Sequence, residues 1–262
     1  MKKRWLAVVL ALCLCASLVP VGARADDDPA TQYKDAVGVS TYETMKNALP
    51  SEELEPNNEN VVLIPVAELT QNLELTSEQD IRTQGKLIIP SGVTLTINSS
   101  FEAETEIQSG GAVVVKNGGY FCTTMGGDTQ NAGTITVEKG GVMQSTMGAS
   151  IVNQDGGTIT LNGTFYCGSV NYENADHLWF ANSGTVSGSG DVIVYEAGAG
   201  DEGRASVNLD TMIQAAKTAL NNKTISVYKQ VTVSSSDALE SLFNAQRGVE
   251  GNADIIAELQ NN

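Results

Sequence analysis

The amino-acid sequence predicts an all-β solenoid, in which short strands from successive circuits of the chain stack on one another, with short helical segments at both ends. Three observations between residues 85 and 195 support this prediction. A short strand pattern recurs, apolar and polar residues alternate within it, and turns rich in asparagine and glycine separate the copies.

The recurring strand sets the length of the repeat. Its four copies are Val93–Ile97, Gly111–Val115, Gly133–Val137 and Gly157–Leu161. Their last residues are 18, 22 and 24 positions apart, which is the length of one solenoid circuit. Successive side chains of a strand point to opposite faces. Because apolar residues occupy alternate positions in every copy, one face of the strand is apolar throughout. We therefore expect a column of core residues formed by Leu95, Val113, Ile135 and Ile159.

A second strand recurs within the circuits, and a turn motif recurs with it. The second strand appears at residues 119–122, 141–144 and 163–166. Its alignment predicts a core stack of Phe121, Met143 and Phe165. The turns Asn131–Thr134 and Asn182–Thr185 match directly, and Asn153–Thr158 matches with two extra residues. Asparagine and glycine tolerate the left-handed backbone of a sharp corner, and stacked asparagines can hydrogen-bond to one another along the axis.

With these repeats the chain resembles the right-handed parallel β-helix proteins of the pectate-lyase-like superfamily. In particular it resembles adhesin-like surface proteins of Gram-positive bacteria, whose circuits carry N-x-G-T-I-type repeats. The resemblance covers about residues 85–195 and concerns the geometry of a circuit, not a reaction. It implies a structural or adhesin-like surface module. The alternative is a protein that binds polysaccharide or degrades it as a lyase, so enzymatic activity is left open.

The segments on either side of the repeats predict caps for the open ends of the solenoid. Residues 26–84 form a linker and a helix-strand cap. Ser40 to Glu43 have the spacing of a capping box, Pro50 stops the helix, and Val61–Ile64 is a strand. Residues 196–262 form a second helix-strand cap or a small α/β segment. Its first helix has an apolar face made of Leu209, Met212, Ile213, Ala216, Ala219 and Leu220.

After that helix, the pattern predicts two strands and two short helices. The strands are Ile225–Val227 and Val231–Val233. The helices are amphipathic and contain Leu239–Phe243 and Ile255–Leu259.

The first 25 residues predict export. Three basic residues precede an apolar run from Trp5 to Val19, and small residues follow at Ala23 and Ala25. This order is typical of a secretory signal cut before Asp26, which leaves a secreted or cell-surface chain without a membrane span. The formal net charge of −16 disfavours nucleic acid and anionic membranes as partners. An extracellular glycan or a host or cell-surface protein is the expected partner.

The resemblance also implies where lyase chemistry would lie, although we assign no catalytic residue. Calcium would bind clustered aspartates. The candidates are Asp128, Asp155 and Asp191, of which Asp128 and Asp155 are the metal ligands we expect. Lys116 and Lys139 would be the candidate bases. Turn aspartates need no function, however, and no cofactor is predicted.

The cysteines and the histidine do not predict a zinc site. Cys122, Cys167 and the single histidine, His177, lack the spacing of zinc ligands. The two cysteines should point to opposite faces about 10 Å apart, beyond the reach of a disulfide.

Four aromatic residues form a candidate glycan-binding strip: Tyr120, Tyr166, Tyr172 and Trp179. Flat exposed rings stack on sugars. Alternatively, Trp179 pins an inserted loop onto the circuit below it.

Overall fold

The computed structural model describes residues 30–51, 54–57, 60–124, 126–146, 148–172, 175–197, 206–233 and 255–259. In this part of the chain, parallel β-strands in stacked sheets dominate, and there are two helices. The predicted signal segment, with Ala23 and Ala25, and the predicted helix at Leu239–Phe243 lie outside the described residues.

The described strands form a large sheet of 14 strands, a small sheet of six strands and one separate pair. The large sheet contains β2 (Val37–Val39), β4 (Val66–Leu69), β6 (Ile81–Ile89), β8 (Ser100–Ile107), β10 (Tyr120–Cys122), β11 (Thr129–Asn131), β13 (Val142–Ser145), β14 (Ile151–Asn153), β16 (Thr164–Tyr172), β17 (Ala175–Leu178), β18 (Phe180–Asn182), β20 (Asp191–Glu196), β21 (Ser226–Val233) and β22 (Ile255–Leu259). The small sheet contains β5 (Leu73–Leu75), β7 (Thr94–Ile97), β9 (Ala112–Val115), β12 (Thr134–Val137), β15 (Thr158–Leu161) and β19 (Thr185–Gly188). The separate pair is β1 (Ala30–Tyr33) with β3 (Val61–Ile64).

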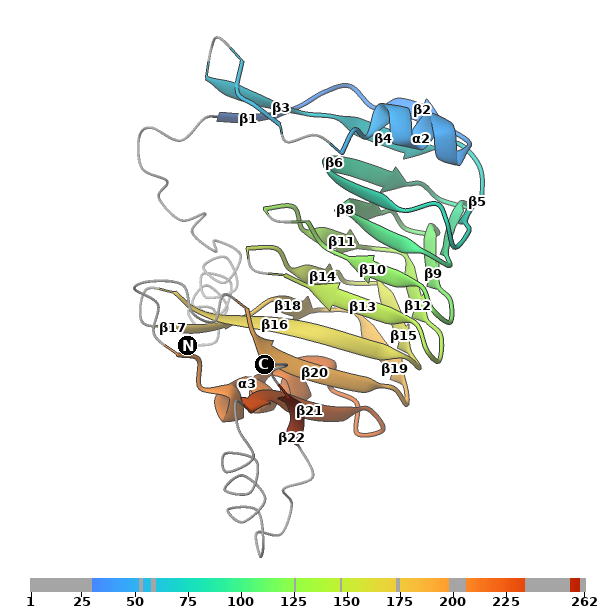
Figure 1. The fold of residues 1–262 in the computed structure, drawn as a ribbon. Helices are drawn as coiled ribbons and strands as arrows, with labels where there is room; N and C mark the ends of the chain where they lie inside the picture. Colours follow the sequence, from blue (N-terminus) through green and yellow to red (C-terminus); the bar gives the residue numbers. More distant parts are fainter. Residues whose placement is uncertain are drawn as a thin grey trace, which may run out of the picture.

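The chain passes repeatedly from the small sheet to the large sheet and back (Figure 1). The path from β12 through β13 and β14 to β15 is one such circuit. β13 pairs with β10 and β16, whereas β14 pairs with β11 and β18, so the large sheet holds two parallel ladders. β8 joins them, because its first half pairs with β10 and its second half with β11. These stacked parallel strands are consistent with a β-helix-like fold.

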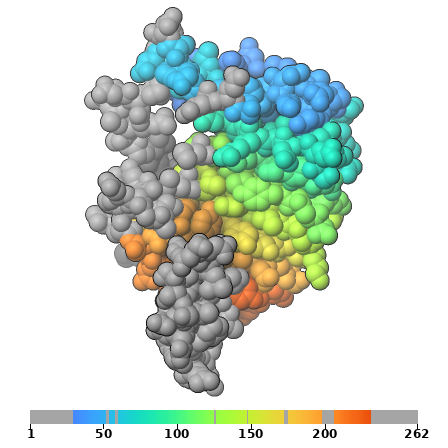
Figure 2. All heavy atoms as spheres, in the orientation of Figure 1, coloured from blue at the N-terminus to red at the C-terminus, as the bar shows by residue number. Residues whose placement is uncertain are grey.

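Parallel pairing extends past residues 85–195 in both directions. β5 pairs with β7 and β4 pairs with β6 on the N-terminal side, while β20 pairs with β21 on the C-terminal side. In Figure 2 the described residues follow one another as bands of colour from one end of the molecule to the other. Each circuit therefore contacts mainly the circuits next to it.

The interior contains aliphatic rows that follow the strand register. Register pairing stacks the four residues of the predicted column, namely Leu95, Val113, Ile135 and Ile159. None of them is more than 1% exposed, and the row continues to Leu73 at one end and Val186 at the other. Burying each aliphatic side chain contributes about 1.5–3 kcal/mol, so the row is a main source of stability.

A second interior row is largely aromatic. Phe101, Phe121, Met143 and Phe165 are register partners in β8, β10, β13 and β16. The rings of Phe101 and Phe121 stack with centroids 6.0 Å apart, and Phe165 meets Phe180 edge-on at 5.3 Å. The last three residues of the row are those that the second recurring strand predicts.

Three asparagines, of which Asn131 and Asn153 are fully buried, form a hydrogen-bonded ladder at one corner. The Asn131 side-chain amide donates to Asn153 Oδ1 at 2.7 Å, and Asn153 donates to Asn182 Oδ1 at 2.7 Å. Asn182 in turn donates to the backbone carbonyl of Ala219 at 2.7 Å. All the amides point the same way, so the ladder ends on a carbonyl in the last turn of a helix, where backbone acceptors lack intrahelical donors.

The glycine of the N-x-G-T motif has a different role from the predicted one. φ is positive at neither Gly133 nor Gly184, so the corner is not left-handed there. Instead, a Cβ at Gly133 would lie 2.3 Å from the carbonyl oxygen of Gly111, and one at Gly184 would lie 2.2 Å from that of Gly157. Glycine is required because the neighbouring circuit comes too close for a side chain. The left-handed backbone occurs at Gly156, with φ 80°, in the longer turn.

The first helix, α2 (Tyr42–Ala48), starts one residue later than the sequence pattern predicts. The expected capping box of Ser40 and Glu43 is wrong, because Thr41 is the N-cap and Thr44 completes the box. The backbone of Thr41 is extended, which lets its hydroxyl accept the Thr44 N–H at 3.2 Å.

The second helix, α3 (Leu209–Leu220), buries its predicted apolar face. Met212, Ile213, Ala216 and Leu220 are buried, and Asn221 closes the helix in a left-handed conformation. In Figure 1, α2 and α3 lie at opposite ends of the sheets.

Two predictions for the C-terminal segment are wrong. One continuous strand, β21, stands where two strands were expected at Ile225–Val227 and Val231–Val233. Ile255–Leu259, expected as a helix, is the strand β22 and pairs in parallel with β21. A five-residue helix is only marginally stable by itself, whereas the free edge of β21 offers a full row of backbone partners.

Both described cysteines are buried and free. The register places Cys122 level with Tyr166, one residue before Cys167, so the two thiols are out of step across β10, β13 and β16. They do not form a disulfide, as expected. Burial raises the pKa of the Cys122 thiol to about 11.

We predict that Asn153→Ala lowers the free energy of unfolding by about 2–4 kcal/mol, because it removes the two 2.7 Å hydrogen bonds that the fully buried Asn153 side chain makes with Asn131 and Asn182. Chemical denaturation measures this loss. Gln154→Ala is the matched control, since the neighbouring side chain is exposed and should change stability by less than about 0.5 kcal/mol. Equal stability of the two variants would show that the ladder is not a stabilising element.

Candidate functional site

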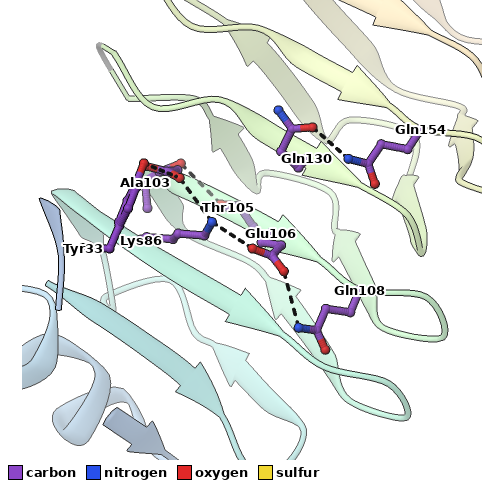
Figure 3. Close-up of polar contacts among 9 residues, drawn as sticks. Tyr33, Lys86, Ala103, Thr105, Glu106, Gln108, Gln130 and Gln154 are labelled. Atoms are coloured by element: carbon purple, nitrogen blue, oxygen red, sulfur yellow. Dashed lines mark hydrogen bonds and ion pairs between the residues drawn. The ribbon is translucent and has the colours of Figure 1, made fainter. Parts of the chain in front are cut away.

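A group of polar side chains lies on the outer face of the large sheet, over β6, β8, β11 and β14 (Figure 3). We call this surface the polar face and define it by Lys86, Glu104, Glu106, Gln108, Gln130 and Gln154. Strand alternation puts these side chains outside, because every second residue of β6 and β8 is buried in the core.

Lys86 forms ion pairs with both glutamates of the polar face. Its ammonium lies 2.8 Å from Glu106 Oε2 and 3.4 Å from Glu104 Oε1, and its side chain is only 18% exposed. Burial alone would lower the pKa of Lys86, but the hydrogen bonds and charges of Glu106 and Glu104 outweigh it and raise this pKa. The hydrogen bond from Lys86 lowers the pKa of Glu106. Lys86 and Glu106 therefore hold each other in their charged forms.

Tyr33 brings the N-terminal strand β1 onto the same surface. Its hydroxyl donates to the carboxylate of Glu104, 2.8 Å from Oε2 and 3.0 Å from Oε1. The ammonium of Lys86 lies 5.2 Å from the centroid of the Tyr33 ring, within the range of a cation–π contact. Burial, with the hydrogen bond and charge of Glu104, raises the pKa of Tyr33, so its hydroxyl stays a donor.

Three glutamines continue the polar face toward the C-terminal end. Gln108 Nε2 donates to Glu106 Oε1 at 3.4 Å, and Gln154 Nε2 donates to Gln130 Oε1 at 3.0 Å. Figure 3 shows the two pairs on the same face of the sheet. Between them is a groove of about 340 Å³. We call it the glutamine groove; it is lined by Glu106, Ile107, Gln108, Ser109, Gln130, Ala132 and Gln154.

The predicted tyrosines do not line up into one strip. Tyr120 is level with Val142 and Thr164, whereas Tyr166 is level with Cys122, two residues further along the strand. Tyr120 is half-buried, and its hydroxyl donates to the side chain of Gln144 at 2.8 Å. The side chain of Tyr172 lies outside the described residues.

Trp179 contacts the protein itself. Its backbone N–H donates to the carbonyl of Gly168, and a Cβ on Gly168 would lie 3.1 Å from Trp179 Cδ1. The indole N–H is buried and has no partner among the described residues. Trp179 therefore lies against β16 at the end of the β16–β17 hairpin, and the exposed His177 lies on that hairpin.

The residues proposed for lyase chemistry lie at three different corners of the circuits. Asp128 lies between β10 and β11, and Asp155 lies between β14 and β15. Lys116 and Lys139 both lie where the chain leaves the small sheet for the large one, and Asp191 begins β20.

Among the described residues, neither Asp128 nor Asp155 is near a cluster of metal ligands. The Asp128 carboxylate accepts the Ser150 N–H at 2.6 Å, and Asp155 is an exposed turn residue. Within the described residues, no group of three or more histidine, cysteine or acidic side chains could hold a metal ion.

A second repeated motif, T-M-G at residues 124–126 and 146–148, occurs where the chain crosses from the first ladder of the large sheet to the second. There, isolated bridges join Thr124 to Gly127 and Thr146 to Ala149. The hydroxyl of Thr123 accepts the Thr146 N–H at 3.0 Å, which ties one loop to the next. The β16–β17 hairpin occupies this corner in the following circuit. We call it the loop corner. In the sequence, the only indication of this corner was the T-M-G motif, which occurs there in two copies.

Comparisons with models of known protein families, with curated proteins and with solved structures find no match for this chain. Neither helix in the described part of the chain is long and apolar enough to cross a membrane.

We predict that Glu106 stabilises the fold only above acidic pH. Because its pKa is lowered in the folded chain, its contribution is complete above its ordinary value of 4.5 and is lost as the pH falls through the lowered value. Glu106→Gln should therefore cost about 0.5 kcal/mol at neutral pH, and the cost should vanish once the pH falls below the lowered pKa of Glu106.

Denaturation of both chains across this pH range measures the difference. Glu138→Gln is the control, because Glu138 and Lys116 form a pair whose lysine is more exposed. A difference between wild type and Glu106→Gln that stays constant down to the lowest pH would contradict the assignment.

Proposed function

We propose that this chain is an exported structural module of the adhesin-like type, built as a right-handed parallel β-solenoid with a helical cap at each end and secreted or held at the cell surface. The observation that carries the proposal is the stacking of buried rows from circuit to circuit. Because only the inward side chains of each circuit form the core, the outward side chains are available for other contacts. Stacked repeats provide the extended surfaces that repeat proteins use for binding.

What the two helices bury supports their role as caps. Met45 is fully buried and Leu49 is 2% exposed, next to β2 and β4. At the other end, Met212, Ile213 and Leu220 of α3 join the core beside β20 and β21. A stack of circuits ends in an open layer of apolar side chains, which has to be covered.

The last strand of the small sheet has its edge blocked, which also supports a closed end. The Asn222 amide donates to the carbonyl of Val186 at 3.1 Å, and the Thr224 hydroxyl donates to that of Gly188 at 2.6 Å. These β19 carbonyls are the groups with which a further strand would pair.

The N-terminal sequence and the charge support export. A basic segment, an apolar run and small residues precede Asp26 in the order of a secretory signal. The net charge of −16 favours solubility of the exported protein outside the cell.

We predict that the full chain, expressed in a Gram-positive bacterium, is recovered outside the cytoplasm with Asp26 as its first residue. N-terminal sequencing of the recovered protein checks the cleavage. Replacing Ala23 and Ala25 with arginine should block it, whereas serine at the same positions should preserve it, because the cleavage site needs small residues. Recovery of the uncleaved wild-type chain from the cytoplasm would refute export.

We also predict that beads coated with the exported chain adhere to surfaces coated with neutral glycans, such as mannan or dextran. Retention under flow is the measurement. Beads coated with an acidic albumin control for charge and should wash away. Equal release of the two kinds of bead would remove the adhesin-like part of the proposal and leave the structural part.

A further inference from the structure

Ala132 produces the glutamine groove. The strand register places Gln108, Ala132 and Gln154 in one row, each directly after paired residues of β8, β11 and β14. Glutamine stands on both sides of Ala132, so its small side chain leaves a gap between two long ones. Ile107 also lines the groove, although its side chain is buried in the core.

The glutamines present both donors and acceptors to this gap. Each amide has a donor end and an acceptor end, and the two hydrogen bonds described above use Gln108 Nε2, Gln154 Nε2 and Gln130 Oε1. Among the described contacts, the opposite ends remain, which are two carbonyl oxygens and the Gln130 amide nitrogen. The bonds already made fix the direction of each side chain before a ligand arrives, which lowers the entropy cost of binding.

The charges around the groove exclude one class of ligand. Glu106 lines it, and the only ammonium beside Glu106 in the described contacts is that of Lys86, which Glu104 shares. The chain as a whole carries a net charge of −16. An anionic ligand would therefore be repelled, whereas hydroxyl groups can donate to the carboxylate and carbonyl oxygens and accept from the amide.

We propose that the glutamine groove binds a neutral polyhydroxylated ligand, namely one or two hexose units of an uncharged glycan, and that Ala132 keeps the groove open. The inference rests on the proposed adhesin-like function and assigns it a surface. The volume of about 340 Å³ falls at the small end of the range for small-molecule sites. Binding through hydrogen bonds alone is weak, so adhesion would come from many chains acting together.

Filling the groove tests the proposal. Ala132→Gln continues the glutamine row and occupies the gap, and Ala112→Gln is its matched control. Ala112 is also half-buried and points outward, but from β9 in the small sheet. Denaturation of both variants verifies that they fold like wild type. The probes are mannotriose and maltotriose, with trigalacturonate as the anionic comparison.

NMR titration reports binding through the side-chain amide signals of Gln130 and Gln154. We expect these signals to shift in wild type with a neutral trisaccharide, and the affinity to fall about tenfold in Ala132→Gln, equivalent to about one lost hydrogen bond. It should stay within about twofold in Ala112→Gln, which leaves the polar face unchanged. Trigalacturonate should bind more weakly than either neutral sugar.

Three results would overturn the proposal. They are the absence of shifts with both neutral sugars at about 10 mM, equal affinity in Ala132→Gln and wild type, and equal binding of trigalacturonate. If beads coated with wild type and with Ala132→Gln adhere equally to a glycan surface, the groove is refuted while the adhesin-like function stands. If neither adheres, the adhesin-like function itself fails.

Discussion

The structure depends on one constraint, which is that hydrogen-bonded strands of successive circuits lie at a fixed spacing of about 4.8 Å. Each side chain therefore meets the equivalent side chain of the next circuit directly. A row must contain residues that tolerate close neighbours of their own kind. Aliphatic rows, an aromatic row and the asparagine ladder all satisfy this condition. The glycines at residues 133 and 184 satisfy it by having no side chain at all.

Much of the interior could be predicted, because repetition along the sequence becomes stacking in space. The column through Val113 and Ile135 follows from the alignment of the recurring strand alone. Local rules were less reliable. The capping box moved from Ser40 to Thr41, since both residues have the right chemistry and only the backbone selects one of them. The strand at Ile255–Leu259 depends on the edge of β21, a partner that a short segment does not reveal.

The polar face could not be predicted from motifs, because its charged residues come from β6 and β8, which are not copies of either recurring strand. Acidic residues at every second position were visible in the sequence, at positions 102, 104 and 106. Lys86, the partner of Glu104 and Glu106, lies in another strand, and a bulge between Arg82 and Lys86 sets which residues face each other. The expected alignment of Tyr120 with Tyr166 was wrong for a related reason, because the strand register places the two residues in different rows of the sheet.

The circuits differ from one another at the loop corner but not in the strands on either side of it. In β8 the chain crosses this corner as an uninterrupted strand, in the next two circuits it forms short loops, and in the following one it forms a hairpin. The ladders on both sides keep their register throughout. Length can thus be gained at this corner without cost to the strands, so it is the site where an engineered peptide graft would be best tolerated.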